Sequence, residues 1–586
     1  MDVSNFAAGL AKVIVLSVLA VLVGWPLAAT VIEAAGVPGR LAAGLTALGL
    51  TRGARTVQQT GALEPEPATG NAIDPVATAP MLSPSAGLSR PARLAFETLC
   101  LVLLTEVIVL PPGVLLALLL FRTDVPGRGF LIVLLGIAAF VPLPLHATAW
   151  LGAFGIAGRM QAIGVRPFLV GRTGAAVVSA LAAFPWVVLL CGAGLRTVEP
   201  ELEEAAALDL PPSRVCASVT LRRSLGPIAA TALAVAVLTA GDMTVTDLLQ
   251  VRTYAEEAYV QFTLGRGPAD AAVVSIPPLL VLGAAILVVA TALLRVDPAR
   301  LASAFSRTRL WKLGRLRLPL GVFLIFLVGN LAALPLYSLL WRAGRVGGKA
   351  RLGHPPVWSI GGLVGSLRFA ASESWEPIQT SLTLAAAAAT VAAILAWSLA
   401  WFSRRSRFWQ ILVLALLALT LATPGPVAGM ALELAYRRLS IIYDSPAILV
   451  IAQASRTLPY AILVLWPALR IFPRDLLESA AMDGHGPCVL IWRVALPLSW
   501  RALLASWFIV FVLAFGELPA TSLLQPPGTC TMTFLIWTLV HTGVESHLAS
   551  VALVMLLVMT VAAVCAIVVV RLAVRGSNAL SGSSPP

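Results

Sequence analysis

The sequence predicts an all-α, polytopic membrane protein built from two similar halves. Its 586 residues are 59% hydrophobic and 12% charged, against roughly 25% charged residues in a typical soluble domain. The mean hydropathy is +0.91, and many apolar stretches approach the roughly 20 residues that span a bilayer. Polar motifs also recur at a long offset along the chain. These observations exclude an ordinary soluble enzyme and a disordered chain.

The net charge of the chain and its Cys and His residues argue against further classes of protein. In a soluble protein, a net charge of +13 would suggest a nucleic-acid partner. Here the basic residues lie mostly between apolar segments, so we expect positive-inside topology in a lipid bilayer and no nucleic acid. The six Cys and five His show no ligand spacing. We therefore expect no disulfide framework, no metal site and no cofactor.

Residues 1–35 are predicted to hold a first span that is retained. Its apolar run, Val13 to Ile32, is longer than the roughly 7–15-residue core of a cleaved signal peptide. Residues 36–94 lose periodicity and become rich in Pro, Ala, Gly and Ser, which indicates a flexible extracytoplasmic loop. The rest of the first half occupies 95–294, with predicted spans at 95–121, 130–154, 172–195, 226–250 and 271–294.

A basic linker over 295–317 precedes a second half over 318–575 and a disordered tail over 576–586. Twelve spans place both termini on the side of the basic linker, which should be the cytoplasmic side of the cell's inner (plasma) membrane. The basic loop 342–352 departs from this rule. Prolines are expected to interrupt spans at Pro111-Pro112, Pro142 and Pro424. The spans of the second half are predicted at 318–341, 380–402, 410–435, 446–470, 501–524 and 549–570.

An internal repeat relates the two halves. Glu204-Ala-Ala-Ala-Leu-Asp209 matches Glu478-Ser-Ala-Ala-Met-Asp483, an offset of 274 residues (204 to 478). Gly241–Gln250 matches Gly516–Gln525 at an offset of 275 (241 to 516). The offset spans six helices, an even number, so the halves have the same orientation. This predicts a parallel repeat about a pseudo-two-fold axis along the membrane normal.

The two Glu-x-Ala-Ala blocks are predicted to form short helices between the fourth and fifth spans of each half. Pro211-Pro212 should stop the first helix, and Gly484 should stop the second in a left-handed cap. A single copy is most simply a solvated loop helix. Two copies at symmetric places, each flanked by Arg, indicate a pair of docking elements. Their residues are Glu204, Ala205, Ala206, Asp209, Leu210, Glu478, Ala480, Ala481, Asp483 and Gly484.

At these residues the chain resembles the membrane (permease) subunits of binding-protein-dependent ABC importers. Their cytoplasmic loop reads E-A-A-x-x-x-G and is followed by an apolar-x-L-P turn. Glu478–Gly484 followed by Val494-Ala-Leu-Pro497 fits with one Ser substitution. The first copy departs from the pattern at Leu210 and Arg222. The stretch 515–528 is similar, more narrowly, to fused two-half permeases of the iron(III) and thiamine type.

The resemblance implies a type I importer permease fold and a division of labour between chains. The short helices would be coupling helices that seat on two ATP-binding subunits, and an extracytoplasmic binding protein would deliver the cargo. Iron(III) is the first expectation, followed by thiamine, another small cation or an oxyanion. No G-x-x-x-x-G-K-[ST] phosphate loop occurs in the sequence, so we expect the ATPase to be a separate chain and this chain not to be an enzyme.

Ionisable residues inside predicted spans are functional hypotheses by default. Glu106, Asp242 and Glu517 are such residues, and the last two occupy repeat-equivalent positions. They could line the translocation path and favour a cation. They could equally cap or pack the outer ends of their helices, which is the interpretation that we favour.

Two other classes stay open at this stage. A secondary transporter with six plus six helices would need an ion relay, and it would leave the paired loops unexplained. A degenerate, non-transporting permease is suggested by Leu210 and Arg222.

Overall fold

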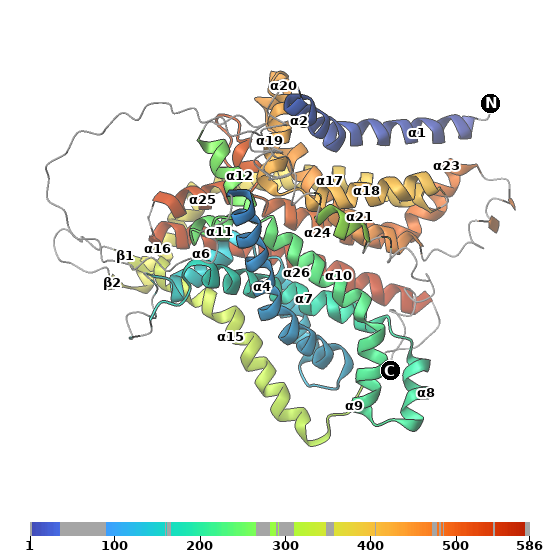
Figure 1. Ribbon diagram of the computed structural model, residues 1–586, viewed down its shortest axis with the longest axis horizontal. Helices are drawn as coiled ribbons and strands as arrows, with labels where there is room; N and C mark the ends of the chain where they lie inside the picture. Colours follow the sequence, from blue (N-terminus) through green and yellow to red (C-terminus); the bar gives the residue numbers. More distant parts are fainter. Residues whose placement is uncertain are drawn as a thin grey trace.

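The computed structural model is helical, apart from a short antiparallel pairing of β1 (Arg345–Val346) with β2 (Val357–Trp358). Figure 1 shows long helices running roughly side by side. The structure describes residues 3–35, 90–156, 166–264, 282–288, 310–346, 357–404, 406–470, 486–542 and 545–580, with positions 158, 160, 164, 280, 291, 478–479 and 482–483. The all-α, polytopic fold is as predicted.

The first half begins with one long, locally π-helical span and continues through a series of helices. These are α1 (Val3–Leu19), η1 (Ala20–Gly24), α2 (Trp25–Ala35), α4 (Arg90–Arg122), α5 (Arg128–Ala139), α6 (Leu143–Phe154), α7 (Gly171–Arg196), α8 (Pro200–Asp209), α9 (Pro212–Val215), η3 (Cys216–Leu221), α10 (Leu225–Ala240), α11 (Thr244–Leu248) and α12 (Tyr254–Thr263).

The second half repeats much of this series. Its helices are η4 (Gly314–Leu316), α15 (Arg317–Ala343), α16 (Ile360–Glu373), α17 (Trp375–Ser403), α18 (Arg407–Ala422), α19 (Gly425–Tyr436), α20 (Ser440–Tyr443), α21 (Ala447–Arg470), α23 (Pro487–Leu490), η6 (Ile491–Ala495), α24 (Leu496–Phe515), η7 (Thr521–Leu523), α25 (Met532–Thr542) and α26 (Glu545–Leu580).

The predicted count of twelve spans is not confirmed. Within the described residues, 8 helices are long and apolar enough to cross a membrane, or up to 11 spans if each bent pair counts as one. The predicted span 271–294 lies mostly outside the described residues. The predicted spans 226–250 and 501–524 are too long at their C-terminal ends, because α10 stops at Ala240 and α24 at Phe515.

Two predicted spans are broken, and one predicted interruption is absent. The spans 130–154 and 410–435 are bent pairs, α5 with α6 at 102° and α18 with α19 at 108°. Pro142 and Pro424 cause the breaks, because each is the extended residue that precedes the second helix of its pair. In contrast, α4 continues through Pro111 and Pro112.

Two boundaries also change. Residues 90–94, assigned to the extracytoplasmic loop, belong to α4. Residues 576–580, assigned to the disordered tail, extend α26. The remainder of the loop (36–89), most of the basic linker (295–309) and the end of the tail (581–586) lie outside the described residues.

The repeat found in the sequence recurs in the backbone. The π-helical turns η3 and η6 begin at Cys216 and Ile491, an offset of 275 (216 to 491). Each lies between a long helix (α7 or α21) and the helix that follows (α10 or α24). The bent pairs α5–α6 and α18–α19 also correspond. The two halves therefore share a local fold as well as a sequence motif.

The first span packs on the second half, and α15, which begins the second half, packs on both halves. The Trp25 indole N–H donates to the Ala435 carbonyl at 3.0 Å, and the Tyr436 hydroxyl donates to the Val21 carbonyl at 2.5 Å. On the other side, Leu324 of α15 lies in the hydrophobic cluster of α4 and α7. The sequence grouped residues 1–35 with the first half, whereas in space they pack on the second.

The core of the second half is made of α17, α21, α24 and α26. Fully buried alanines at 385, 388, 389 and 392 line α17, and such small residues let membrane helices approach closely. In Figure 1, α8, α23, the start of α1 and the end of α26 lie toward the right of the molecule. Helices α11, α12, α16 and α25 lie toward the opposite end.

Candidate functional site

The first docking helix predicted from the sequence is α8. It starts at Pro200, with proline in the first turn, where no N–H partner is lost. It ends at Asp209 because Leu210 is extended ahead of Pro211, at φ −123° and ψ 144°. The predicted helix and its proline stop are confirmed. Of the residues assigned to docking, Glu204, Ala205 and Asp209 are exposed, while Ala206 and Leu210 are half-buried.

The carboxylate next to the assigned one is fully buried. Arg122 at the end of α4 donates to Glu203 Oε1 in an ion pair whose two side chains are both 0% exposed. The Thr220 hydroxyl donates to the same oxygen at 2.6 Å. Glu203 therefore attaches α8 to α4 and to η3. The sequence analysis did not identify this ion pair.

The second loop is described in part. Glu478, Met482 and Asp483 are exposed, whereas Ala480, Ala481 and Gly484 lie outside the described residues. Met482 is 83% exposed, and Leu208 at the equivalent position of α8 (208 to 482, offset 274) is 86% exposed. Each loop therefore presents one large apolar side chain at the same place in the repeat.

A cavity of about 270 Å³ lies between the two halves. Many of its lining residues occur as repeat pairs. They include Trp186 with Tyr460, Val237 with Val512, Leu238 with Leu513, and Gly241 with Gly516. Because equivalent residues of both halves face one space, the cavity lies on the pseudo-two-fold axis. The sequence analysis identified the repeat but could not place its two copies around a common cavity.

The two acids in repeat-equivalent positions bind backbone. The Asp242 carboxylate accepts N–H bonds from Thr244 and Val245, both at 2.9 Å, and so caps α11. The Glu517 carboxylate accepts from Ala520 at 2.9 Å and Thr521 at 3.0 Å, and so caps η7. Asp242 also lines the cavity.

Glu106 has a different environment. It lies half-buried in α4, outside the set of residues that line the cavity. The structure therefore brings Asp242 to the cavity wall, places Glu517 on the equivalent turn of the other half, and leaves Glu106 apart from both.

A plug made of two further repeat pairs lies beside these acids. Met243, Leu518 and Trp537 form a buried cluster with Tyr259 packed against it. Met243 and Leu518 are equivalent at the offset of 275. Tyr259 and Trp537 are equivalent when α12 is matched to α25. The Trp537 indole N–H donates to the Tyr259 hydroxyl at 3.4 Å, with the rings edge to face.

The close approach of the halves continues around this plug. A Cβ on Gly516 would lie 3.1 Å from Pro142 Cγ, so a larger residue there would push against the α5–α6 bend. His541 Nε2 lies 3.1 Å from Asp247 Oδ2, joining α25 to α11. The plug and these contacts join the two halves at the end that carries α11, α12 and α25.

Taken together, the fold and site define an all-α, permease-like membrane protein of two parallel repeats around a shared cavity. Comparison with known proteins supports the permease-like character of the second half. Residues 381–578 match the family described as binding-protein-dependent transport system inner membrane component. This match lies in the second half, where the loop motif follows the pattern with one substitution.

Curated relatives are also transport system permease proteins by name. The putrescine transport system permease protein PotI of Escherichia coli (strain K12) is 30% identical over 184 residues, which cover 29% of this chain and 64% of PotI. The spermidine/putrescine transport system permease protein PotC of the same strain is 27% identical over 188 residues, 31% of this chain and 71% of PotC. The molybdenum transport system permease protein ModB of Mycobacterium bovis (strain ATCC BAA-935 / AF2122/97) is 33% identical over 159 residues, 24% of this chain and 60% of ModB.

Proposed function

We propose that this chain is the membrane-spanning subunit of an ABC importer and forms the translocation path for a small solute. The observation that carries the proposal is the cavity between the halves, whose walls are repeat-equivalent residues. The plug of Met243, Leu518, Tyr259 and Trp537 closes one end of it. An alternating-access carrier needs such a path with a closure at one end, and repeats that can rock about it.

The two loops supply the attachment for a separate motor. Leu208 and Met482 project from repeat-equivalent loops, and each would enter an apolar cleft on one of two ATP-binding subunits. Glu203 and Arg122 would pass movement of α8 to α4, because their buried ion pair joins the two helices. In this proposal the end that carries α8 and α23 faces the cytoplasm, together with both termini. An extracytoplasmic binding protein would dock at the opposite end.

The comparisons leave the cargo open among small solutes. The names of the relatives specify putrescine, spermidine and molybdenum, and these belong to those proteins. Iron(III) and thiamine, expected from the resemblance at 515–528, have no support from these names and stay predictions. The fused two-half organisation is part of the same proposal, supported by the shared series of elements in the two halves.

The alternative of a secondary transporter is less well supported. Its ion relay would need carboxylates that are available to exchange protons or ions. Both oxygens of Asp242 and of Glu517 accept backbone N–H bonds instead. A non-transporting permease is also disfavoured, because the first loop forms its helix despite Leu210 and Arg222.

The direct experiment is reconstitution. The chain would be purified with its ATP-binding subunits, placed in liposomes and supplied with its binding protein on the outer side. We expect uptake that requires hydrolysable ATP on the inner side, and no ATP hydrolysis by the chain alone. Uptake driven by an ion gradient without any ATP-binding subunit would overturn the proposal.

A further inference from the structure

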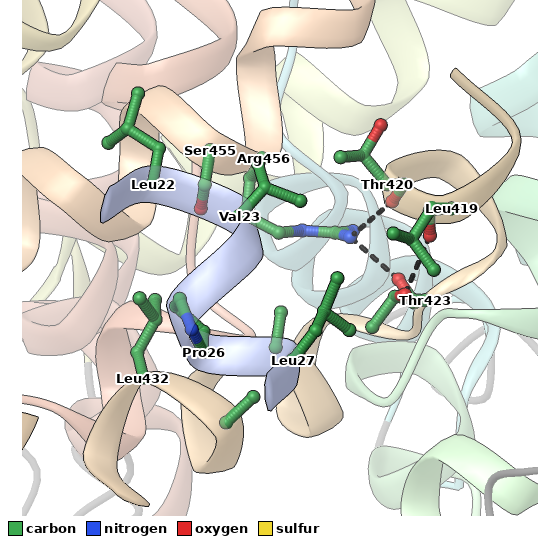
Figure 2. Close-up of a pocket in the computed structure, with 12 residues that line it drawn as sticks. Leu22, Val23, Pro26, Leu27, Leu419, Thr420, Thr423, Leu432, Ser455 and Arg456 are labelled. Atoms are coloured by element: carbon green, nitrogen blue, oxygen red, sulfur yellow. Dashed lines mark hydrogen bonds between the residues drawn. The ribbon is translucent and has the colours of Figure 1, made fainter. Parts of the chain in front are cut away.

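Arg456 is a charged residue in the middle of a span, and the repeat does not require it. It lies on α21, and its counterpart in the first half is Ala182 (182 to 456, offset 274). Figure 2 shows its guanidinium pointing to the bend between α18 and α19. Its Nη1 donates to the carbonyls of Thr420 at 3.2 Å and Thr423 at 2.7 Å. Carbonyls at the end of a helix lack partners within it, so one guanidinium nitrogen is anchored there.

The same guanidinium lies between two cavities. On one side is a small cavity of about 50 Å³, walled partly by Leu22, Val23, Pro26 and Leu27 of the first span. On the other side is the central cavity between the halves, which Arg456 also lines. A guanidinium has five N–H donors. Among the described residues, its two hydrogen bonds both come from Nη1, which leaves Nε and Nη2 without a hydrogen-bond partner in the described part of the chain.

The other charged group on this wall does not pair with Arg456. Among the described residues that line the central cavity, Arg456 and Asp242 are the charged ones. The Asp242 carboxylate is engaged by two backbone N–H groups, and no ion pair joins it to Arg456 in the described part of the chain. Trp186 and Tyr460 add an indole N–H and a hydroxyl at repeat-equivalent positions. The cavity therefore offers hydrogen-bond donors around one cation.

We propose that the central cavity binds a small oxyanion, with Arg456 as its charged ligand and Trp186 and Tyr460 as neutral donors. An anchored, planar guanidinium presents paired N–H groups that match the spacing of oxyanion oxygens. A charge inside a span is costly and is typically found on a substrate path. The inference rests on the proposed function and specifies the class of cargo. It argues against the alternative, raised from the sequence, that Asp242 and Glu517 line the path and favour a cation.

The charge of the cavity can be measured without knowing the cargo. Ala182 lines the same cavity and is half-buried, so A182C places a thiol near Arg456. The purified full chain would be treated with methanethiosulfonate reagents carrying either a sulfonate or a trimethylammonium group. Mass spectrometry of the peptide containing position 182 separates this reaction from those of the native cysteines. We expect the sulfonate reagent to react about tenfold faster, after correction for its rate with a free thiol.

Variants at position 456 test whether Arg456 is the source of this preference. Arg456→Gln in the A182C background should abolish it, whereas Arg456→Lys should keep most of it. Arg470→Gln, at the end of the same helix and outside the cavity lining, is the matched control and should change nothing. If the glutamine variant does not fold, the preference in the parent A182C protein still decides. Equal rates there, a faster cationic reagent, or no reaction with either reagent would overturn the proposal.

Protection experiments then test binding itself. Sulfate and molybdate are the probes, and putrescine is the cationic comparison at equal ionic strength. We expect both anions to slow labelling of the introduced thiol and putrescine to have no effect; protection by putrescine alone would overturn the inference. The proposed function is tested separately. If uptake required ATP but the cavity showed no preference for the anionic reagent, the permease assignment would stand and the oxyanion site would be wrong. If the cavity bound anions but uptake did not require ATP, the oxyanion site would stand and the permease assignment would be wrong.

Discussion

The two loops that we assign to docking share their exposed face and differ in their attachment. In the first, Glu203 is buried against Arg122 and Thr220. In the second, the equivalent position (203 to 477, offset 274) is Leu477, so the same carboxylate anchor cannot form. The exposed apolar residue, Leu208 or Met482, is present in both. The exposed apolar residue that a partner could contact is therefore present in both loops, whereas the carboxylate that anchors the loop belongs to the first half.

The opposite end of the molecule shows the same kind of difference. Tyr259 of α12 and Trp537 of α25 are both aromatic and contact each other edge to face. One turn earlier, Glu256 of α12 corresponds to Phe534 of α25. The aromatic residue is thus repeated, while a neighbouring buried residue is acidic in one half and apolar in the other.

Removing the anchor of the first loop should have the largest effect. Glu203→Ala leaves Arg122 buried and unpaired, which we expect to lower the free energy of unfolding by about 3–5 kcal/mol. The neighbouring exposed Glu204→Ala should change it by less than about 0.5 kcal/mol. Unfolding of the purified protein in one detergent, followed by circular dichroism, gives both values. Equal effects of the two substitutions would show that the buried pair does not anchor α8.

The ion pair between Glu203 and Arg122 also shows which part of the site the sequence could not predict. The Glu-x-Ala-Ala block, the proline after Leu210 and the long offset were enough to predict α8, its end and the repeat. Glu203 and Arg122 are 81 positions apart, and no local pattern joins them. The sequence showed many arginines near the loop and gave no reason to choose one from α4.

The central cavity was harder still to foresee. Trp186 and Tyr460 were recognised as repeat-equivalent, but a repeat in sequence does not reveal which faces of the two copies meet. The interruptions at Pro142 and Pro424 were expected from the prolines, but hydropathy shows only a continuous apolar stretch and gave no sign that the chain bends by 102° and 108° there. The uninterrupted α4 shows the converse, since Pro111 and Pro112 are accommodated within a helix.

Substitutions in the plug should have the next largest effect. Trp537→Ala removes a large buried side chain, a change that typically costs about 3–5 kcal/mol, and it should weaken the closed end of the cavity. We expect a rise in solute leakage through liposomes that contain the chain without ATP. Tyr259→Phe keeps its ring and is the control, with leakage close to that of the parent. If both variants leaked alike, or neither did, the plug would not be the closure.

Glu256 should give the first half a pH dependence that Phe534, the residue matched to it in α25, cannot give the second half. The residue lies on α12, outside the candidate spans. Burial raises the pKa of its carboxyl to about 7, opposed by Arg252 and assisted by Glu257 and Asp247. The folded state therefore favours the protonated form. Its contribution to stability is fully present below about pH 4.5 and is lost as the pH rises through about 7.

A substitution can isolate this contribution. Glu256→Gln should raise the free energy of unfolding at pH 8 by up to about 3 kcal/mol and flatten its dependence between pH 4.5 and 7. Glu201→Gln, on the exposed surface of α8, is the matched control and should leave the slope unchanged. Unfolding curves over this pH range provide the measurement. A parent protein whose stability rises with pH across this window would contradict the assignment.

The smallest predicted effect concerns the caps of the two loops. Leu210 has a negative φ, so Leu210→Gly should be tolerated. Gly484→Leu would cost roughly 1 kcal/mol if that residue forms the predicted left-handed cap.

We likewise expect Glu478→Lys to reduce ATP-dependent uptake and retention of the ATP-binding subunits more than Glu204→Lys. If Leu210→Gly and Glu204→Lys caused the greater losses, the first loop would be the more sensitive of the two. The permease proposal would still stand.

Site-specific cross-linking from the two exposed apolar positions tests the central claim most directly. A photoreactive amino acid would replace Leu208 in one variant and Met482 in another, and each would be irradiated in membranes that contain the whole complex. Leu208 and Met482 occupy equivalent, exposed positions. We therefore predict that both variants cross-link to an ATP-binding subunit and that ATP changes the yield at both. Cross-linking to lipid alone at both positions, in membranes where ATP-dependent uptake is active, would contradict the account.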